Sequence, residues 1–300
     1  MLRTLNESEI ARVLSYERLI PAMEQALAAF SAGEVQQPVR SMIRIEEGQR
    51  YLGIMPAVMQ GGMGAKLVCF YPKNAAAGLP THMATIMLFD TETARPLACL
   101  DGRLITEMRT AAVSAAVTRY LAPADTRVLA LLGSGVQAQA HLTALGHVCR
   151  FEEVRVWSRN PEHAQRFAAR HGARAMDAES AVRGADVVVT VTSSREPVLK
   201  GAWLKPGAHV NAVGACLPDW RELDDAALRG STLIVDSRAA ALEESGDVIL
   251  SGAEIHAEAG EVFAGTRRVA RESTTVFKSL GLAVEDIATA RLVYDALQAA

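Results

Sequence analysis

The 300-residue sequence predicts an α/β fold, in which a Rossmann-type doubly wound parallel sheet is joined to a second, α+β domain. Three observations support this prediction. The chain is longer than the roughly 250 residues at which a single hydrophobic core stops growing. From residue 126 onward, short apolar runs alternate with helical patterns. A glycine-rich turn, with Gly133 and Gly135, separates the first of these runs from the first of these helices.

The first third of the chain has a different pattern. Residues 5–31 are expected to be rich in helix, because apolar side chains recur there at helical spacing. Short apolar runs broken by Gly and Pro then predict an antiparallel or mixed sheet: Ser41–Ile45, Tyr51–Ala57, Ala65–Tyr71, Thr85–Phe89 and Pro96–Leu100. The Ala- and Val-rich segment Ile105–Leu121 predicts a buried helix that leads into the next domain.

The second part of the chain reads as a parallel sheet with helices on both faces. Its expected strands are Val128–Leu132, Val154–Trp157, Val187–Val191, Val210–Val213 and Leu233–Val235, and its clearest helices are Val136–Leu145 and Glu162–Arg170. The segment Val284–Leu297 has an apolar stripe at helical spacing. We expect this last helix to return to the first domain.

Composition and charge exclude several classes of protein. A net charge of -3, with Lys and Arg spread along the chain, argues against a nucleic-acid partner. The four cysteines have no C-x-x-C spacing, and acidic residues interrupt the N-terminal segment, so we expect a reduced, cytoplasmic protein without a membrane partner. The seven histidines form no metal-binding pattern, and no catalytic metal is expected.

The glycine-rich turn is the strongest local signal for a cofactor. Its sequence is Gly133-Ser-Gly135-Val136-Gln137-Ala138, between an apolar strand and a helix. Gly133 permits the tight turn, Gly135 lets the backbone approach a pyrophosphate, and the small Ala138 allows close packing of helix and strand. An isolated match of this kind is common, but the alternating strands and helices that follow favour a dinucleotide site.

The residues at the end of the second strand of a Rossmann domain determine whether it binds NAD or NADP. An acidic residue there would bind the ribose hydroxyls of NAD, but this chain has Ser158, Arg159 and Asn160. Because Arg159 can pair with a 2′-phosphate, NADPH is expected, with NADH bound more weakly. The alternative is a solvated arginine at a strand end. Ligands of such sheets also lie at the ends of later strands, here near Thr192 and Val213.

The chain resembles the ornithine cyclodeaminase and mu-crystallin family over nearly its whole length, most of all the mu-crystallin branch of NADPH-dependent ketimine reductases. The resemblance is carried by Gln37-Pro-Val-Arg40, Tyr51-Leu-Gly-Ile-Met-Pro-Ala57, Lys66-Leu-Val, Arg109-Thr-Ala-Ala-Val-Ser-Ala115, Lys205-Pro-Gly-Ala-His-Val-Asn-Ala-Val-Gly-Ala215, Pro218-Asp-Trp-Arg-Glu-Leu-Asp-Asp225, Glu244-Ser-Gly-Asp247 and Thr274-Thr-Val-Phe-Lys-Ser-Leu-Gly281. Several uncommon sequence motifs that occur in the same order along the chain make chance similarity a poor explanation.

The resemblance implies a homodimer with two domains. Residues 1–120 with 280–300 would form the substrate-binding and dimerisation domain, and 121–279 the Rossmann domain. The resemblance also implies that Arg40 and Arg109 hold the substrate carboxylate and that Lys66 lies beside them. Thr81 and His82 would lie near the cofactor.

Two of these residues stand out by their sequence context as well. Lys66 alternates with Val68 and Phe70 on one face of an expected strand, so its ammonium would meet apolar surroundings unless an anion is present. Desolvation would lower its pKa and make it a proton donor near neutrality. The alternative is an edge lysine whose ammonium reaches water. Arg109 likewise implies a partner anion within its apolar helix, or else lies on the helix surface.

The resemblance is looser after the fourth expected strand of the Rossmann domain, Val210–Val213. The cyclodeaminase branch has an aspartate where this chain has Cys216, and a thiol does not supply the same persistent negative charge. Cys216 can also be read as a small apolar loop residue. Asp219 and Glu244 are the nearby carboxylates that complete the expected substrate site.

Together these features predict reduction of a cyclic ketimine carboxylate to a cyclic amino acid. Pyrroline-2-carboxylate, piperideine-2-carboxylate and sulfur analogues are the expected substrates. An ornithine cyclodeaminase and an alanine dehydrogenase are the alternative enzymes, and both are disfavoured by Arg159 and Cys216. A non-catalytic protein that binds a small molecule such as thyroid hormone is the alternative from another class, and Arg40, Lys66 and Arg109 favour catalysis over it.

Overall fold

The computed structural model describes residues 2–46, 49–270 and 272–299 and divides the chain into two compact units. The first unit comprises residues 1–109 and 281–300, and the second comprises residues 110–280. The boundary between them falls inside helix α3 (Arg103–Leu121). Within the described residues, no helix is long and apolar enough to cross a membrane.

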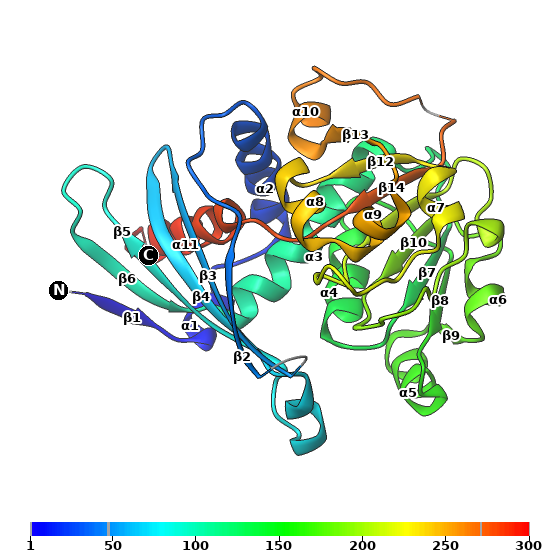
Figure 1. Cartoon of the computed structure of the whole chain (residues 1–300). Helices are drawn as coiled ribbons and strands as arrows, with labels where there is room; N and C mark the ends of the chain where they lie inside the picture. The colour runs from blue at the N-terminus through cyan, green and yellow to red at the C-terminus, as the bar shows by residue number, and fades with distance from the viewer. Residues whose placement is uncertain (1, 47–48, 271, 300) are drawn as a thin grey trace. The chain divides into compact units, whose positions relative to one another are not determined.

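The first unit is built on a six-stranded mixed sheet (Figure 1). Its strands, in spatial order, are β1 (Arg3–Leu5), β6 (Pro96–Asp101), β5 (His82–Phe89), β4 (Gly62–Phe70), β3 (Arg50–Met59) and β2 (Ser41–Glu46). β1 pairs with β6 in parallel, and the other neighbours are antiparallel. The expected mixed sheet is therefore confirmed, although the short β1 was not expected from the sequence.

The C-terminal helix α11 (Ala283–Gln298) covers one face of this sheet. The other helices of the unit are α1 (Glu7–Ala11), α2 (Tyr16–Ser31) and a short 3-10 helix, η1 (Pro72–Ala77), which follows β4. α11 contacts β3, β4 and β5, and α2 packs on α11. Gly62 and Gly64 of β4 make room for this helix, since a Cβ on either residue would lie 3.2 or 2.9 Å from the Ile287 side chain. The last helix thus belongs to the first unit, as expected.

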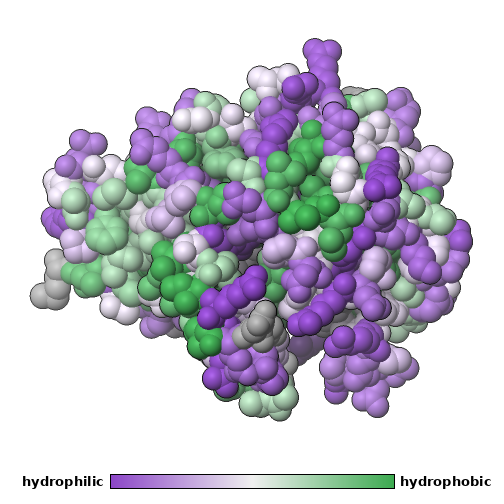
Figure 2. All heavy atoms as spheres, viewed as in Figure 1, coloured by the Kyte–Doolittle hydropathy of each residue, from purple (hydrophilic) through white to green (hydrophobic). Residues whose placement is uncertain are grey.

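The opposite face of the sheet is apolar and open. Strand register places Ile43, Leu52, Cys69 and Met83 in one cross-strand row on this face, with Leu67 in the next. Ile43, Leu67 and Met83 are each about half exposed, at 48%, 47% and 45%. In Figure 2 a hydrophobic area lies where Figure 1 draws the end of β2.

The second unit is an eight-stranded sheet in which every pair of neighbours is parallel. In spatial order the strands are β13 (Ile255–Glu258), β12 (Thr232–Val235), β14 (Thr275–Lys278), β11 (His209–Ala212), β10 (Val187–Thr190), β7 (Val128–Leu132), β8 (Glu153–Trp157) and β9 (Arg174–Ala175). The order reverses between β7 and β10, which is where dinucleotides bind in Rossmann folds.

Helices connect these strands. They are α4 (Val136–Leu145), α5 (Pro161–His171), α6 (Ala178–Val182), η2 (Gly201–Trp203), α7 (Asp225–Arg229), α8 (Arg238–Glu244), α9 (Gly246–Ser251) and α10 (Ala259–Phe263). The strands of the centre are fully buried, as Val187, Val188 and Val189 show with 0% exposure. The predicted Rossmann fold is confirmed. Three of its strands, β9, β13 and β14, were not expected, and β14 inserts between β11 and β12.

Candidate functional site

The glycine-rich turn of the second unit directly follows β7. Gly133 has a φ of +126°, a conformation that residues with a side chain rarely adopt. A Cβ at Gly133 would also lie 2.7 Å from the carbonyl oxygen of Val191, the residue directly after the neighbouring strand β10. Its backbone N–H donates to the carbonyl of Trp157 at 2.9 Å. Both the conformation and the space at this position therefore require glycine.

The next residues form the start of α4. Gly135 is its N-cap and makes no side-chain capping bond, so the first amide groups of the helix keep their hydrogen-bonding capacity for a ligand. A Cβ at Gly135 would meet no atom within 4 Å, which shows open space in front of the backbone. Val136 and Gln137 begin the helix, and Ala138 is fully buried against the sheet. This arrangement fits the pyrophosphate of a dinucleotide.

The residues expected to select the cofactor lie where β8 ends. Asn160 is the N-cap of α5, and its side-chain oxygen accepts the backbone N–H of Glu162 at 3.0 Å. Arg159 is exposed, and no described carboxylate forms an ion pair with it. Ser158 is half-buried beside it. None of the three is acidic, so this strand end carries no negative charge that would repel a phosphate.

A buried lysine holds the loop that follows β11. Lys278, at the end of β14, donates from Nζ to the carbonyl of Gly214 and, at 3.3 Å, to that of Ala215. The same Nζ lies 3.0 Å from a carboxylate oxygen of Asp247, and both side chains are fully buried. Burial opposes the charge of Lys278, but Asp247, Cys216 and Glu222 together outweigh it and raise the pKa of this lysine. The loop includes Ala215, whose φ of +54° is unusual for a residue with a side chain.

Two acidic side chains extend this cluster. The other oxygen of Asp247 accepts the backbone N–H groups of Glu222 and Leu223 at 2.8 and 2.9 Å. Glu222 in turn accepts the hydroxyl of Thr190 at 2.7 Å and the backbone N–H of Thr192 at 2.5 Å. Burial raises the pKa of Glu222 to about 7, although Lys278 lowers it. Val213 is tied to the same strand end through its N–H, which donates to the Thr190 carbonyl at 2.9 Å.

The first unit contains a second buried ionic cluster, centred on Lys66. This lysine lies in β4 on the face that meets α11, and it is 1% exposed. Its Nζ is 2.6 Å from a carboxylate oxygen of Asp286 in α11. Burial, helped by the charges of Arg109 and Arg40, lowers the pKa of Lys66 to about 8 against the effect of Asp286. Lys66 is therefore no edge lysine that reaches water.

Arg109 completes this cluster from α3. Its guanidinium donates to Glu285 at 2.6 Å and to Asp286 at 3.2 Å, and it is 5% exposed. Burial opposes the charge of Arg109, but the two carboxylates raise its pKa. Gly281, with a φ of +83°, makes room for the guanidinium, because a Cβ there would lie 2.4 Å from it. The partner anion expected for Arg109 is thus supplied by the protein itself.

His82 lies near these cations. Its ring stacks on Phe70 with centroids 4.4 Å apart, and Thr81 contacts its Nδ1 at 3.2 Å. The residue keeps an exposed surface, but the protein atoms packed around its ring partly desolvate it. This desolvation, together with the charges of Lys66 and Arg109, lowers the pKa of His82 to about 4. The ring is therefore neutral at physiological pH.

The remaining expected residues are distributed over both units. Arg40, in the first unit, is half-buried just before β2 and contributes to the potential at Lys66. Cys216, Asp219 and Glu244 belong to the second unit. The Cys216 thiol donates to the Val213 carbonyl at 3.5 Å, Asp219 is exposed in the same loop, and Glu244 is half-buried at the end of α8.

The sequence did not identify the acidic partners in either cluster. Glu285 and Asp286 stand in the first turn of α11, and both are fully buried. Two adjacent acids in an otherwise apolar helix start are a signal that was available. Asp247 and Lys278 lie within the motifs that carry the family resemblance, but no feature of the sequence indicates that the two side chains form an ion pair.

A Rossmann unit with a glycine-rich turn that fits a pyrophosphate defines the chain as a dinucleotide-binding protein. Comparison with known proteins is more specific. The profile of the ornithine cyclodeaminase/mu-crystallin family matches residues 1–300, and the chain belongs to this family. The ketimine reductase mu-crystallin of Mus musculus is 50% identical over 285 residues, which cover 92% of this chain and 91% of that protein.

Solved structures agree with this assignment. The chain superposes on a Thermococcus litoralis Delta(1)-pyrroline-2-carboxylate reductase, in complex with NADH and L-proline, with a TM-score of 0.94 and 36% identity, covering 100% of this chain and 98% of that one. An archaeal alanine dehydrogenase dimer with bound NAD has a TM-score of 0.93 and 34% identity, covering 99% and 96%. The predicted family and fold are confirmed.

Proposed function

We propose that this chain reduces cyclic ketimine carboxylates to cyclic amino acids with NADPH. The observation that carries the proposal is the cluster of Lys66, Arg109, Asp286 and Glu285. It places a proton-carrying group with a pKa of about 8 in the interior of the first unit. Burying these charged groups costs free energy, and perturbed pKa values of this kind are common at functional sites. The relatives of known activity, which include a ketimine reductase and a pyrroline-2-carboxylate reductase, support the same chemistry.

Each unit has its own part in the proposed reaction. The first unit binds the substrate: Arg40 and Arg109 attract the carboxylate and thereby orient the ring, since a guanidinium can hold a carboxylate by two parallel hydrogen bonds. Lys66 keeps a proton on the imine nitrogen. Protonation of the imine nitrogen makes the C=N carbon more electrophilic. Addition of a hydride to this carbon then neutralises the positive charge and gives the amine.

The second unit binds the cofactor, which supplies a hydride to the imine carbon. The turn around Gly133 and Gly135 is proposed to hold the pyrophosphate, for the reasons of space and backbone conformation given above. Lys278 fixes the carbonyl groups of Gly214 and Ala215, and thereby the backbone at the carboxyl end of β11. Open α/β sheets bind their ligands at these strand ends.

NADPH is proposed over NADH because the end of β8 offers Arg159 and no acid. The Thermococcus litoralis reductase was solved with NADH, and the archaeal alanine dehydrogenase with NAD.

The four cysteines, Cys69, Cys99, Cys149 and Cys216, are all free thiols, in agreement with a reducing compartment such as the cytoplasm.

We also propose a homodimer in which two copies cover the apolar face that includes Ile43, Leu67 and Met83. These side chains lie on the sheet face opposite to α11, where each stays about half exposed in one chain. Burial of such a face against its own copy would remove apolar surface from water. The archaeal alanine dehydrogenase of the same fold is a dimer.

The proposed activity is tested by the consumption of reduced nicotinamide cofactor, followed by its absorbance. The panel contains pyrroline-2-carboxylate, piperideine-2-carboxylate and pyruvate with ammonium, each with NADPH and with NADH, and ornithine with NAD as the cyclodeaminase control. We expect the cyclic imines with NADPH to be reduced fastest. Faster turnover of pyruvate with ammonium would instead identify an alanine dehydrogenase. Release of ammonia from ornithine would identify a cyclodeaminase.

A further inference from the structure

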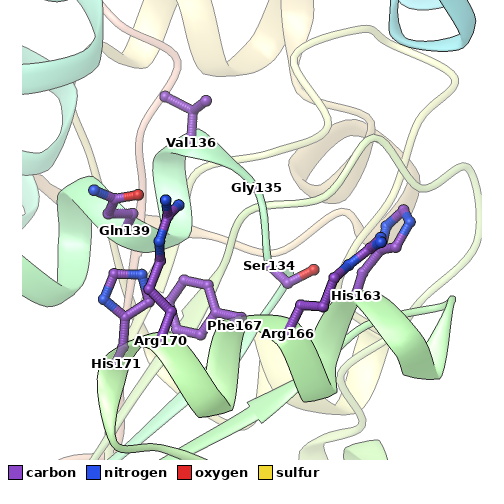
Figure 3. Close-up of a pocket in the computed structure, with 9 residues that line it drawn as sticks. All are labelled: Ser134, Gly135, Val136, Gln139, His163, Arg166, Phe167, Arg170 and His171. Atoms are coloured by element: carbon purple, nitrogen blue, oxygen red, sulfur yellow. The ribbon is translucent and has the colours of Figure 1, made fainter. Parts of the chain in front are cut away.

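A groove lies between α4 and α5 in the second unit. It has a volume of about 540 Å³ and is lined by Ser134, Gly135 and the start of α4 on one side, and by α5 on the other. Figure 3 shows that side chains of α5 rise from that helix toward the turn that carries Ser134 and Gly135. The groove therefore begins at the glycine-rich turn itself.

The lining from α5 is strongly basic. His163, Arg166, Arg170 and His171 follow one another at intervals of three, four and one residues, and no acidic side chain lines the groove. Phe167 lies beneath them and packs against His171, with ring centroids 4.5 Å apart. The positive charges of Arg166 and Arg170, four residues apart on one helix face, repel each other, and this repulsion is relieved when an anion binds.

The two arginines of this row differ from other arginines of the unit. Arg155 and Arg174 both pair with Glu153, and Arg183 pairs with Glu179. Among the described residues, no carboxylate forms an ion pair with Arg166 or Arg170. Their guanidinium groups are exposed and keep their donors for a ligand that comes from solution.

The position of the groove indicates which anion it takes. In a Rossmann site the adenosine ribose lies between the glycine-rich turn and the end of the second strand, which here are Ser134 and Arg159. α5 begins two residues after Arg159, so the side chains of its first two turns, His163 and Arg166, follow directly on that strand end. A phosphate on the 2′-oxygen of this ribose would lie at the mouth of the groove.

We propose that Arg166 is a second arginine of the 2′-phosphate subsite, acting together with Arg159. Arg170 extends the positive potential along the same helix face. The inference rests on the proposed use of NADPH and names the residue that strengthens the preference. According to this proposal, both α5 and the end of β8 determine the preference for NADPH over NADH.

The test compares Arg166→Gln with wild type in titrations of four probes: NADPH, NADH, adenosine 2′,5′-bisphosphate and AMP. Loss of one charge-assisted phosphate contact should weaken NADPH and the bisphosphate by roughly 10- to 100-fold and leave NADH and AMP unchanged. Arg166→Lys should recover part of the loss, because it keeps the charge without the fork of donors. Arg150→Gln is the matched control, since Arg150 is another exposed arginine of this unit that lies outside the groove, and it should behave like wild type.

The outcomes separate this inference from the proposed function. If wild type prefers NADPH and Arg166→Gln keeps the full preference, the inference is overturned while NADPH use stands. An equal loss of NADH and NADPH affinity in Arg166→Gln would also overturn it, since the effect would then not reside in the 2′-phosphate. If wild type binds NADPH and NADH equally, both the inference and the proposed cofactor fail.

Discussion

Replacement of Lys66 by Met tests the proposed chemistry most directly. Met roughly preserves the volume of the lysine stem but removes the charge and all three donors. The change leaves Asp286 without its contact at 2.6 Å, although Arg109 still donates to that carboxylate at 3.2 Å. If Lys66 keeps the imine nitrogen protonated, the variant should lose reduction while its Rossmann unit still binds cofactor.

The size and the pH dependence of the loss follow from the structure. Assistance by a general acid is typically worth about 100- to 10,000-fold in rate, so kcat/KM at neutral pH should fall by at least that lower amount. The protonated lysine is the active form, and its pKa is about 8. Below that pH the advantage of wild type should be complete. Above it, the advantage should fall by about tenfold for each pH unit as Lys66 loses its proton.

The assay measures kcat/KM for both proteins from pH 6 to roughly 10 with one cyclic imine, because this parameter reports the pKa of the free enzyme. The ratio of wild type to variant cancels the ionisation of the substrate itself. NADPH affinity is titrated in parallel and should stay nearly unchanged. The double variant Lys66→Met with Asp286→Asn serves as a control, because it removes the negative charge that Lys66→Met leaves without its lysine.

Two results would refute the reasoning. A Lys66→Met protein that turns over at the wild-type rate would show that the lysine is structural. A ratio that is large but independent of pH would show that Lys66 acts through packing or charge balance and not through its proton. In either case the mechanism would have to be rebuilt around Arg109 or His82.

Four further predictions concern the framework of the site and the proposed dimer. Lys278→Met should lower the free energy of unfolding by about 3 to 5 kcal/mol, because it strands a fully buried carboxylate, and thermal melts should show the loss. Gly133→Ala should cost about 1 to 3 kcal/mol through its φ of +126°. Gly135→Ala should leave the melting temperature unchanged but weaken NADPH binding in calorimetry, because its Cβ would meet only the space left for the cofactor. Leu67→Glu should convert the proposed dimer to a monomer in light scattering, and a wild-type monomer at micromolar concentration would exclude the dimer.

The local pattern of the sequence was sufficient for the core of the Rossmann unit. The expected bounds Val128–Leu132 and Val136–Leu145 are those of β7 and α4. The run Val-Leu-Ala-Leu-Leu is long and uniformly apolar, and the glycine-rich turn after it dictates how the chain reverses into a helix. Such features act over a few residues, so the sequence alone determines them.

Strand β14 shows where local pattern failed. The run Thr275–Lys278 is short and ends in a charge, so it was not recognised as a strand. In the structure it is a fully buried strand between β11 and β12, although it follows β12 and β13 in the chain. The order of strands in a sheet depends on which strand edges are free for pairing when the sheet forms. The local periodicity of the sequence carries no information about this order.

The charged clusters are the clearest case of a decision made by tertiary structure. Lys66 and Arg109 were found from the sequence because a charge within an apolar run needs an anion. Their partners, Glu285 and Asp286, are separated from them in the chain by most of its length, whereas Lys278 pairs with Asp247, which lies 31 residues before it. The energy of an ion pair depends on distance and local dielectric, and the sequence specifies neither. The sequence thus indicated that Lys66 and Arg109, if buried, require anionic partners. Only the packing of α11 on β4 determined which carboxylates they meet, and only the insertion of β14 between β11 and β12 placed Lys278 beside Asp247.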